Sequence, residues 1–104
     1  MPCHGWLLKQ PEKRGTARRR YFAFARKLNC IEYYKTMEDA ASRQGKLGMI
    51  PVSNLSATFA QETQFQLHNP DRIWKLTADT PKDAKKWFDA VTFHIEYLKN
   101  PPAR

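Results

Sequence analysis

Short apolar stretches separated by turn-forming residues occupy the first 78 positions of the chain. Residues 64–68 and 73–77 each alternate apolar with polar side chains, which is the period of a strand that buries one face. The Asn-Pro-Asp triplet between them is typical of a tight turn. Stretches of this kind predict seven short strands, at residues 4–10, 18–27, 30–36, 47–52, 55–60, 64–69 and 72–78.

Two polar segments separate the first four of these strands. Residues 11–17 (PEKRGTA) contain proline and glycine, and they predict a hairpin loop. Residues 37–46 (MEDAASRQGK) predict a charged loop, within which residues 38–44 could form one helical turn.

The hydrophobic period changes after residue 79. Thr80 is a good helix N-cap, and Pro81 suits the first helical position. The apolar residues that follow form one stripe at about 100° per residue, at positions 84, 87, 88, 91, 95 and 98. The pattern predicts an amphipathic helix of about five turns that ends near the Asn-Pro-Pro sequence at 100–102.

One aromatic pair does not fit this helical stripe. Phe93 and Tyr97 project toward the face that carries Lys82, Lys85 and Lys86, and residues four apart are neighbours on a helix. The pair is a candidate partner surface. The alternative is that the chain beyond Tyr97 folds back and covers it.

Seven strands and one helix in 104 residues indicate a single domain that spans residues 1–104. A terminal helix can cover the apolar mouth of an open barrel. We therefore expect a mainly β fold: a seven-stranded antiparallel bent barrel, or orthogonal sandwich, capped by one C-terminal helix.

The net charge of +8 is concentrated near the N-terminus. Residues 1–35 hold nine of the eighteen basic residues but only two of the ten acidic ones. Such a basic region suits an anionic partner, namely phosphate, nucleic acid or a membrane surface. The alternative is a solvated face that keeps a small domain soluble.

Several classes of protein do not fit the sequence. Its two cysteines and three histidines lack the spacing of a disulfide framework or a zinc site, so we expect neither metal nor cofactor. No nucleophile stands beside a plausible base, so we do not expect an enzyme. Without a signal peptide or an apolar membrane span, the expected location is the cytoplasm.

Several segments resemble the pleckstrin homology family. They are GWLLK at 5–9, RRRYF at 18–22, IEYYK at 31–35, GMIP at 48–51, Asn54-Leu55, and Asp79-Thr80-Pro81 leading into a helix that carries Trp87. Six pieces in the expected order cover residues 4–99, and the resemblance implies a pleckstrin homology fold. Members that bind 3-phosphorylated inositol lipids share a lysine that ends the first strand and a [Lys/Arg]-x-Arg that begins the second. Lys9 and Arg18-x-Arg20 match this signature, which implies that these three residues contact inositol phosphates, with Tyr33 as a further contact.

The residues support the same site independently. Alternation places Lys9 on the face of Leu7, and a hairpin over residues 11–17 sets Lys9 nearly opposite Arg19 or Arg20. The loop adds two further cations, Lys13 and Arg14. Arginine forks and a lysine point charge together suit a cluster of phosphates.

The sequence leaves two questions about this site undecided: whether Lys46 contributes to it, and which tyrosine of the third strand points into it. Some tight binders carry a basic residue just before the glycine of the fourth strand, where this chain has Leu47, with Lys46 one position earlier. Because a one-residue shift reverses the face of a strand, Lys46 contributes only if the loop bends. In the third strand either Tyr33 or Tyr34 could be the inward residue.

The function we expect is therefore a phosphoinositide-binding module. It would recruit its protein reversibly to the cytoplasmic face of a membrane during signal transduction. The plasma membrane is the favoured candidate. The alternative is a protein-interaction module with weak, non-specific binding to anionic lipid. Nucleic-acid binding is not expected, because Tyr21 is the one aromatic residue beside the arginine run and single-stranded nucleic acid needs a stacking platform.

Overall fold

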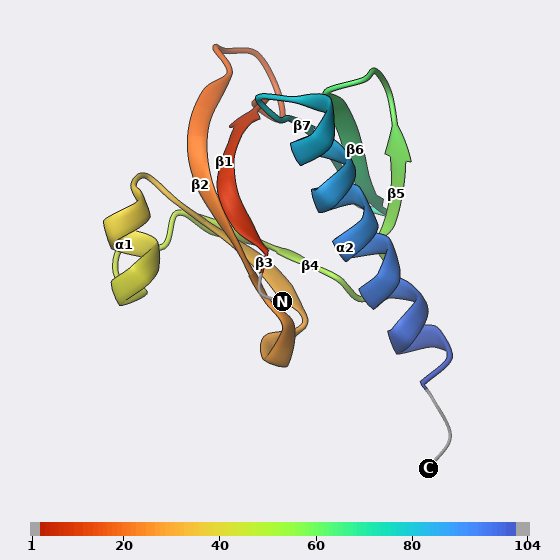
Figure 1. Cartoon of the computed structure of the whole chain (residues 1–104). Helices are drawn as coiled ribbons and strands as arrows, with labels where there is room; N and C mark the ends of the chain where they lie inside the picture. Colours follow the sequence, from red (N-terminus) through yellow and green to blue (C-terminus); the bar gives the residue numbers. More distant parts are fainter. Residues whose placement is uncertain (1–2, 102–104) are drawn as a thin grey trace.

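The computed structural model describes residues 3–101, and within them it has a seven-stranded sheet and two α-helices (Figure 1). All paired strands are antiparallel, in the order β4-β3-β2-β1-β7-β6-β5. The end strands β4 and β5 do not pair within this range, so the barrel is open. The strands are β1 His4–Lys9, β2 Arg18–Ala25, β3 Cys30–Tyr34, β4 Gly48–Pro51, β5 Ser56–Phe59, β6 Gln64–Asn69 and β7 Arg72–Thr77.

The C-terminal helix α2, Pro81–Lys99, lies against the open side of the sheet (Figure 1). The hydroxyl of Thr80 accepts a hydrogen bond from the Asp83 amide, and Pro81 stands in the first turn, which confirms the expected helix start. The stripe buries Ala84, Trp87, Val91 and Ile95. The ring of Trp87 meets Phe22 of β2 edge-on, with ring centroids 6.3 Å apart. Phe88 is partly buried, whereas Leu98 is exposed, so the predicted apolar face holds the helix except at its last position.

A second, shorter helix covers the outer face of the sheet. Helix α1, Met37–Ser42, packs beside β2 and β3, away from α2 (Figure 1). The hydroxyl of Thr36 caps it by accepting a hydrogen bond from the Asp39 amide. The helical turn expected as one reading of residues 37–46 is therefore present. Because α1 covers the β2–β3 pair, side chains on the outer face of these strands are buried as well as those on the inner face.

Strand ends are the part of the fold that the sequence predicted least well. The second strand was expected to run to residue 27, but β2 ends at Ala25 and a 3₁₀ turn, η1 Arg26–Leu28, follows it. Asn29 closes that turn in the left-handed region, with φ of 53°. All seven expected strands match within two residues at each end, and β6 matches at both ends. A hydropathy pattern marks buried faces, whereas the end of a strand depends on where its partner stops pairing.

Among the described residues, neither helix combines the length and hydropathy needed to cross a membrane.

Candidate functional site

The β1–β2 hairpin brings basic side chains together at the open end of the barrel. Its register pairs Lys9 with Arg18, and Leu7 with Arg20. Side chains of directly paired residues lie on the same face, so Lys9, Arg18 and Arg20 share the face of the buried Leu7 and Phe22. The expectation that Lys9 lies nearly opposite Arg19 or Arg20 is wrong: its direct partner is Arg18, and Arg20 is its diagonal neighbour. Hairpin register depends on turn type as well as loop length, and the sequence left the turn type of residues 11–17 undetermined.

Arg19 points to the opposite face of β2. Its guanidinium lies 5.2 Å from the Trp6 ring centroid and donates two hydrogen bonds to the carboxylate of Asp79, at 3.1 and 3.2 Å. One arginine of the RRR run is therefore neutralised on the outside of the sheet.

Tyr33 lies on the same inner face as Lys9. Its ring packs on Phe22, the residue that pairs with it on β2, and the two ring centroids are 5.1 Å apart. The Lys9 Nζ lies 5.3 Å from the centroid of the Tyr33 ring, which is a cation–π contact. Tyr34 points to the outer face and is 1% exposed. The structure thus resolves the choice between the two tyrosines in favour of Tyr33 as the inward neighbour of Lys9.

Gly48 of β4 makes room for this tyrosine. It pairs with Tyr33, and a β-carbon built on Gly48 would lie 2.6 Å from Tyr33 Cζ, closer than real carbon atoms approach one another. The ring can pack over β4 because position 48 has no side chain. The glycine therefore allows the ring to lie where it contacts the Lys9 ammonium.

A further cation, Arg72, joins this face and was missed from the sequence. It is the first residue of β7 and shares the inward side of Trp74 and Leu76. Its guanidinium lies 4.9 Å from the Trp74 ring centroid, and its side chain is 23% exposed. Among the described residues its buried Nε has no hydrogen-bond partner. The alternation of Trp74 and Leu76 was visible in the sequence, and extending it two residues back would have found Arg72.

We refer to Lys9, Arg18, Arg20 and Arg72 as the inner cations. Burial lowers the pKa of the Lys9 amine, the positive charges of Arg72 and Arg20 lower it further, and the charge of Glu12 opposes them. Like charges therefore act on one another across three strands. An anion between them would relieve this repulsion and accept the free N–H donors.

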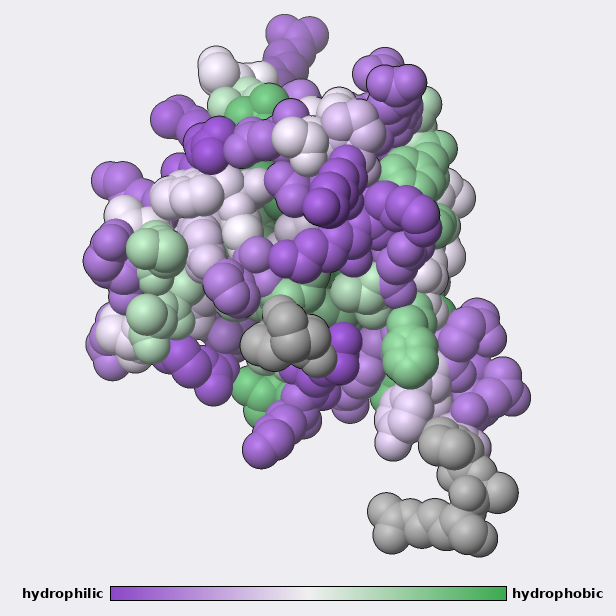
Figure 2. Space-filling view, viewed as in Figure 1, coloured by the Kyte–Doolittle hydropathy of each residue, from purple (hydrophilic) through white to green (hydrophobic). Residues whose placement is uncertain are grey.

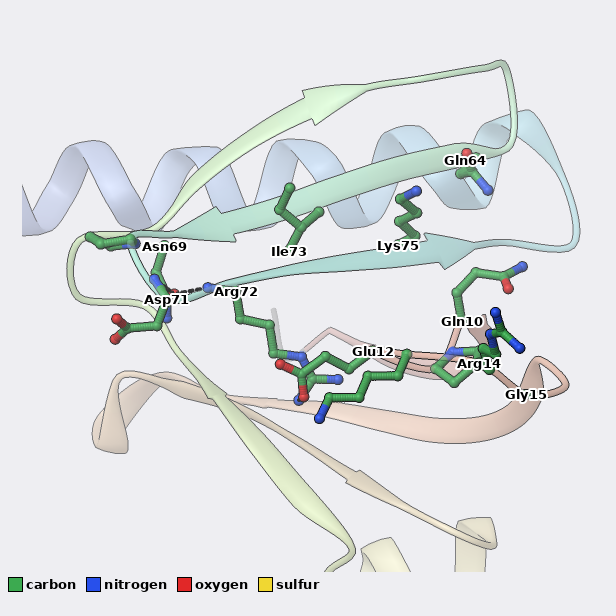
Figure 3. A pocket seen from close by; sticks show the side chains of 13 residues that line it. Gln10, Glu12, Arg14, Gly15, Gln64, Asn69, Asp71, Arg72, Ile73 and Lys75 are labelled. Carbon is green, nitrogen blue, oxygen red and sulfur yellow. Dashed lines mark hydrogen bonds and ion pairs between the residues drawn. The ribbon is translucent and has the colours of Figure 1, made fainter.

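The β1–β2 loop places its own cations to one side of this cluster. Lys13 and Arg14 line a cavity of about 1010 Å³ between the loop and the β6–β7 hairpin (Figure 3). Arg72 and Lys75 line the same cavity, as does Glu12. Arg72 is therefore the inner cation that also lines the cavity of the loop cations.

Lys46 is not brought to the inner cations. Its Nζ lies 3.5 Å from Glu32 Oε2, on the face of β3 opposite to Tyr33. Glu32 is 3% exposed, and it also receives hydrogen bonds from Arg43, at 2.8 Å, and from the Tyr34 hydroxyl, at 2.9 Å. We refer to Glu32, Tyr34, Arg43 and Lys46 as the outer cluster. The bend needed for Lys46 to join the site does not occur in this structure.

The exposed aromatic pair lies elsewhere on the molecule. Phe93 is 63% and Tyr97 48% exposed, and both stand in the second half of α2, far from the β1–β2 loop in Figure 1. Figure 2 shows that apolar side chains reach the surface along α2 among hydrophilic ones. The Tyr97 ring stacks on His94, whose Nε2 lies 2.9 Å from Asn29 Oδ1. Tyr97 is thus partly engaged within the domain, and Phe93 is the freer of the two.

Comparison with known proteins decides the family. A model of the pleckstrin homology domain matches residues 2–97. The chain belongs to the pleckstrin homology family. No curated protein sequence matches it. Pleckstrin homology domains are generally non-catalytic binding modules, and in the described residues no three His, Cys, Asp or Glu side chains form a group that could hold a metal ion.

Solved pleckstrin homology domains share the fold over nearly the whole chain. The domain of human oxysterol-binding protein-related protein 11 is 15% identical, with a TM-score of 0.77 over 100% of this chain and 94% of its own. The C-terminal domain of pleckstrin, solved in complex with D-myo-Ins(1,2,3,4,5)P5, is 27% identical, with a TM-score of 0.75 over 88% of this chain and 95% of its own. The same pleckstrin domain solved with D-myo-Ins(1,2,3,5,6)P5 aligns at 25% identity, with a TM-score of 0.76, over 89% and 93%.

Proposed function

We propose that this pleckstrin homology domain binds the inositol phosphate head group of membrane phosphoinositides at its inner cations. One observation carries the proposal: Lys9, Arg18, Arg20 and Arg72 lie on one face at the mouth of the barrel, where burial, and then the charges of Arg72 and Arg20, lower the pKa of Lys9. The pleckstrin domain that binds inositol pentakisphosphates has 27% sequence identity and the same fold, which supports this ligand class.

The side chains assign roles within the site. Arg18 and Arg20 offer planar forks for bidentate contact with phosphate oxygens, and Lys9 offers a point charge. The Tyr33 ring supports Lys9 through a cation–π contact, and its hydroxyl is the further proposed contact with the head group. Arg72 contributes a buried Nε–H that no described residue accepts. Lys13 and Arg14, on the loop, would meet further phosphates or the anionic membrane surface.

The match of Lys9 and Arg18-x-Arg20 to the family signature leads us to propose a preference for 3-phosphorylated lipids. Binding would bring the protein reversibly to the cytoplasmic face of a membrane in which such a lipid acts as a recruitment signal. The plasma membrane is the favoured candidate. The proposed role is therefore that of a peripheral membrane module in signal transduction.

The test is co-sedimentation with vesicles at about 0.15 M salt, where diffuse charge attraction is partly screened. Vesicles carry one phosphoinositide at a time, with charge-matched phosphatidylserine vesicles as control. Arg20→Ala is compared with Arg19→Ala, which removes the same charge from the adjacent residue but on the outer face. We expect Arg20→Ala to reduce binding to a 3-phosphorylated lipid about tenfold to a hundredfold, and Arg19→Ala to change it little, because each charge-assisted hydrogen bond contributes about 1.5–3 kcal/mol.

Two results would contradict the proposal. Equal losses for both variants, with all anionic vesicles alike, would show a diffuse basic surface. Membrane recruitment in cells that survives Arg20→Ala but is lost in a Phe93→Ser, Tyr97→Ala variant would favour the alternative function, a protein-interaction module that uses the α2 pair.

A further inference from the structure

One carboxylate faces the inner cations. Glu12, in the β1–β2 loop, has its Oε1 3.9 Å from Arg72 Nη1, and Figure 3 shows the two side chains extending toward one another. Its negative charge also acts on Lys9, where it opposes the effect of the neighbouring cations on the pKa of the amine. Glu12 therefore sits where it reaches cations from β1 and β7 at once.

The loop backbone fixes where Glu12 leaves the sheet. The Gln10 amide donates a hydrogen bond to the Lys75 carbonyl at 3.1 Å, so β1 stays attached to β7 for one residue beyond the strand. Pro11 follows with its fixed φ, and Gly15, at φ of 141°, returns the loop close to Pro11. Glu12 thus leaves the sheet beside Arg72 rather than at the free tip of the loop.

The contact between Glu12 and Arg72 is long and displaceable. The Glu12 side chain is 55% exposed, and an ion pair of this kind contributes little to stability. It also leaves the Arg72 Nε–H without an acceptor. The carboxylate therefore adds negative charge to the site without completing the hydrogen bonds of the cation it faces.

We propose that Glu12 is a specificity residue that limits how many phosphates the head group can carry. The inference rests on the proposed function. Where a head group presents a hydroxyl toward Arg72, the Glu12 carboxylate accepts its hydrogen bond. Where it presents a phosphate, carboxylate and phosphate repel one another, and Arg72 has to leave Glu12 to compensate. Glu12 thus favours less phosphorylated head groups over more phosphorylated ones.

The experiment is titration calorimetry with soluble inositol bis-, tris- and tetrakisphosphates at about 0.15 M salt. Glu12→Gln keeps the shape of the side chain and removes its charge. Glu62→Gln, in the exposed loop between β5 and β6, is the matched control for net charge. We expect Glu12→Gln to raise the affinity for the tetrakisphosphate at least about tenfold and that for the bisphosphate no more than about threefold, while Glu62→Gln changes both by less than about twofold.

A double variant tests the route through Arg72. In an Arg72→Gln background, Glu12→Gln should lose most of its selective effect, because the residue that holds the competing phosphate is gone. An equal gain for all three ligands would overturn the inference and leave the proposed function intact. If the Glu12→Gln variant binds the tetrakisphosphate and the wild-type protein does not, the inference is supported most strongly. No binding by either protein, with both folded by thermal melting, would contradict the proposed function itself.

Discussion

Both faces of the sheet gather cations, but only the outer group surrounds a buried carboxylate. On the outer face, Arg43 and Lys46 converge on the buried carboxylate of Glu32. Burial alone would raise the pKa of Glu32, but hydrogen bonds from Tyr34 and Arg43, with the charges of Arg43 and Lys46, outweigh it and hold the pKa below its ordinary value. The cations of the outer cluster therefore already have a buried carboxylate as their partner.

The inner face carries the four inner cations, against two cations in the outer cluster, and no buried carboxylate lies on it among the described residues. Burial and like charges there lower the pKa of Lys9, so the site favours added negative charge. The comparison teaches that basic residues alone do not define an anion site. The position of the counter-charge decides whether a basic cluster holds the fold together or is available to a ligand.

The largest effect is expected from removing the counter-charge of the outer cluster. Glu32→Ala leaves the Tyr34 hydroxyl, which is 1% exposed, without its acceptor and breaks the pairing with two cations. We expect a loss of about 2–4 kcal/mol in the free energy of unfolding, between the cost of an orphaned hydroxyl and that of a broken buried pair. Urea unfolding measures it, with exposed Glu62→Ala as control. Equal stability of the two variants would show that the outer cluster does not support the fold.

The next largest effect is a difference in ligand binding between two lysine variants, one on each face of the sheet. Lys9→Ala should weaken inositol phosphate binding about tenfold to a hundredfold, because it removes a charge-assisted contact from the inner site. Lys46→Ala, which removes the same charge from the outer cluster, should change binding less than about twofold. Calorimetry with one soluble inositol phosphate gives both values. A comparable loss for Lys46→Ala would mean that this lysine leaves Glu32 to reach the ligand, and the distinction between the faces would fail.

Much of the difference between the two faces could not be predicted from the sequence, because it depends on tertiary contacts and on how the loop closes. The helix start at Thr80 and the shared face of Lys9 and Arg20 depend on local spacing, and both were predicted. The pairing of Lys9 with Arg18 depends on how the loop closes, so it was predicted wrongly. The role of Lys46 depends on the burial of Glu32 under α1, which is a tertiary contact.

The third effect tests how the inner site is supported. Gly48→Ala would force the Tyr33 ring to move, because the new β-carbon would come within 2.6 Å of Tyr33 Cζ. We expect a cost of about 1–2 kcal/mol in the free energy of unfolding, as for an overpacked core, and several-fold weaker ligand binding as Lys9 loses its aromatic support. In a Tyr33→Leu background the unfolding cost should largely disappear. If it persists there, Gly48 is needed for the backbone of β4 rather than for the ring.

The smallest effect is a pH dependence that belongs to the inner face alone. Burial and the charges of Arg72 and Arg20 lower the pKa of Lys9, so this amine loses its proton at a lower pH than an ordinary lysine, whose pKa is about 10.4. The second pKa of an isolated phosphate ester is about 6, and rising pH can only add negative charge to the ligand, so the ligand does not cause a fall in affinity. We therefore expect the affinity for an inositol phosphate to fall with rising alkaline pH, starting below the pKa of an ordinary lysine.

Arginine substitutions distinguish the two faces in this measurement. Lys9→Arg keeps its charge over the whole range and should bind with a flat pH profile, whereas Lys46→Arg should retain the slope of the wild type, because Lys46 compensates Glu32 and not the ligand. Fluorescence titration at several pH values, each at constant ionic strength, gives the three profiles. If Lys9→Arg keeps the full slope, the titrating group is not Lys9. The lowered pKa of that amine would then no longer mark the inner face as the one without a buried counter-charge.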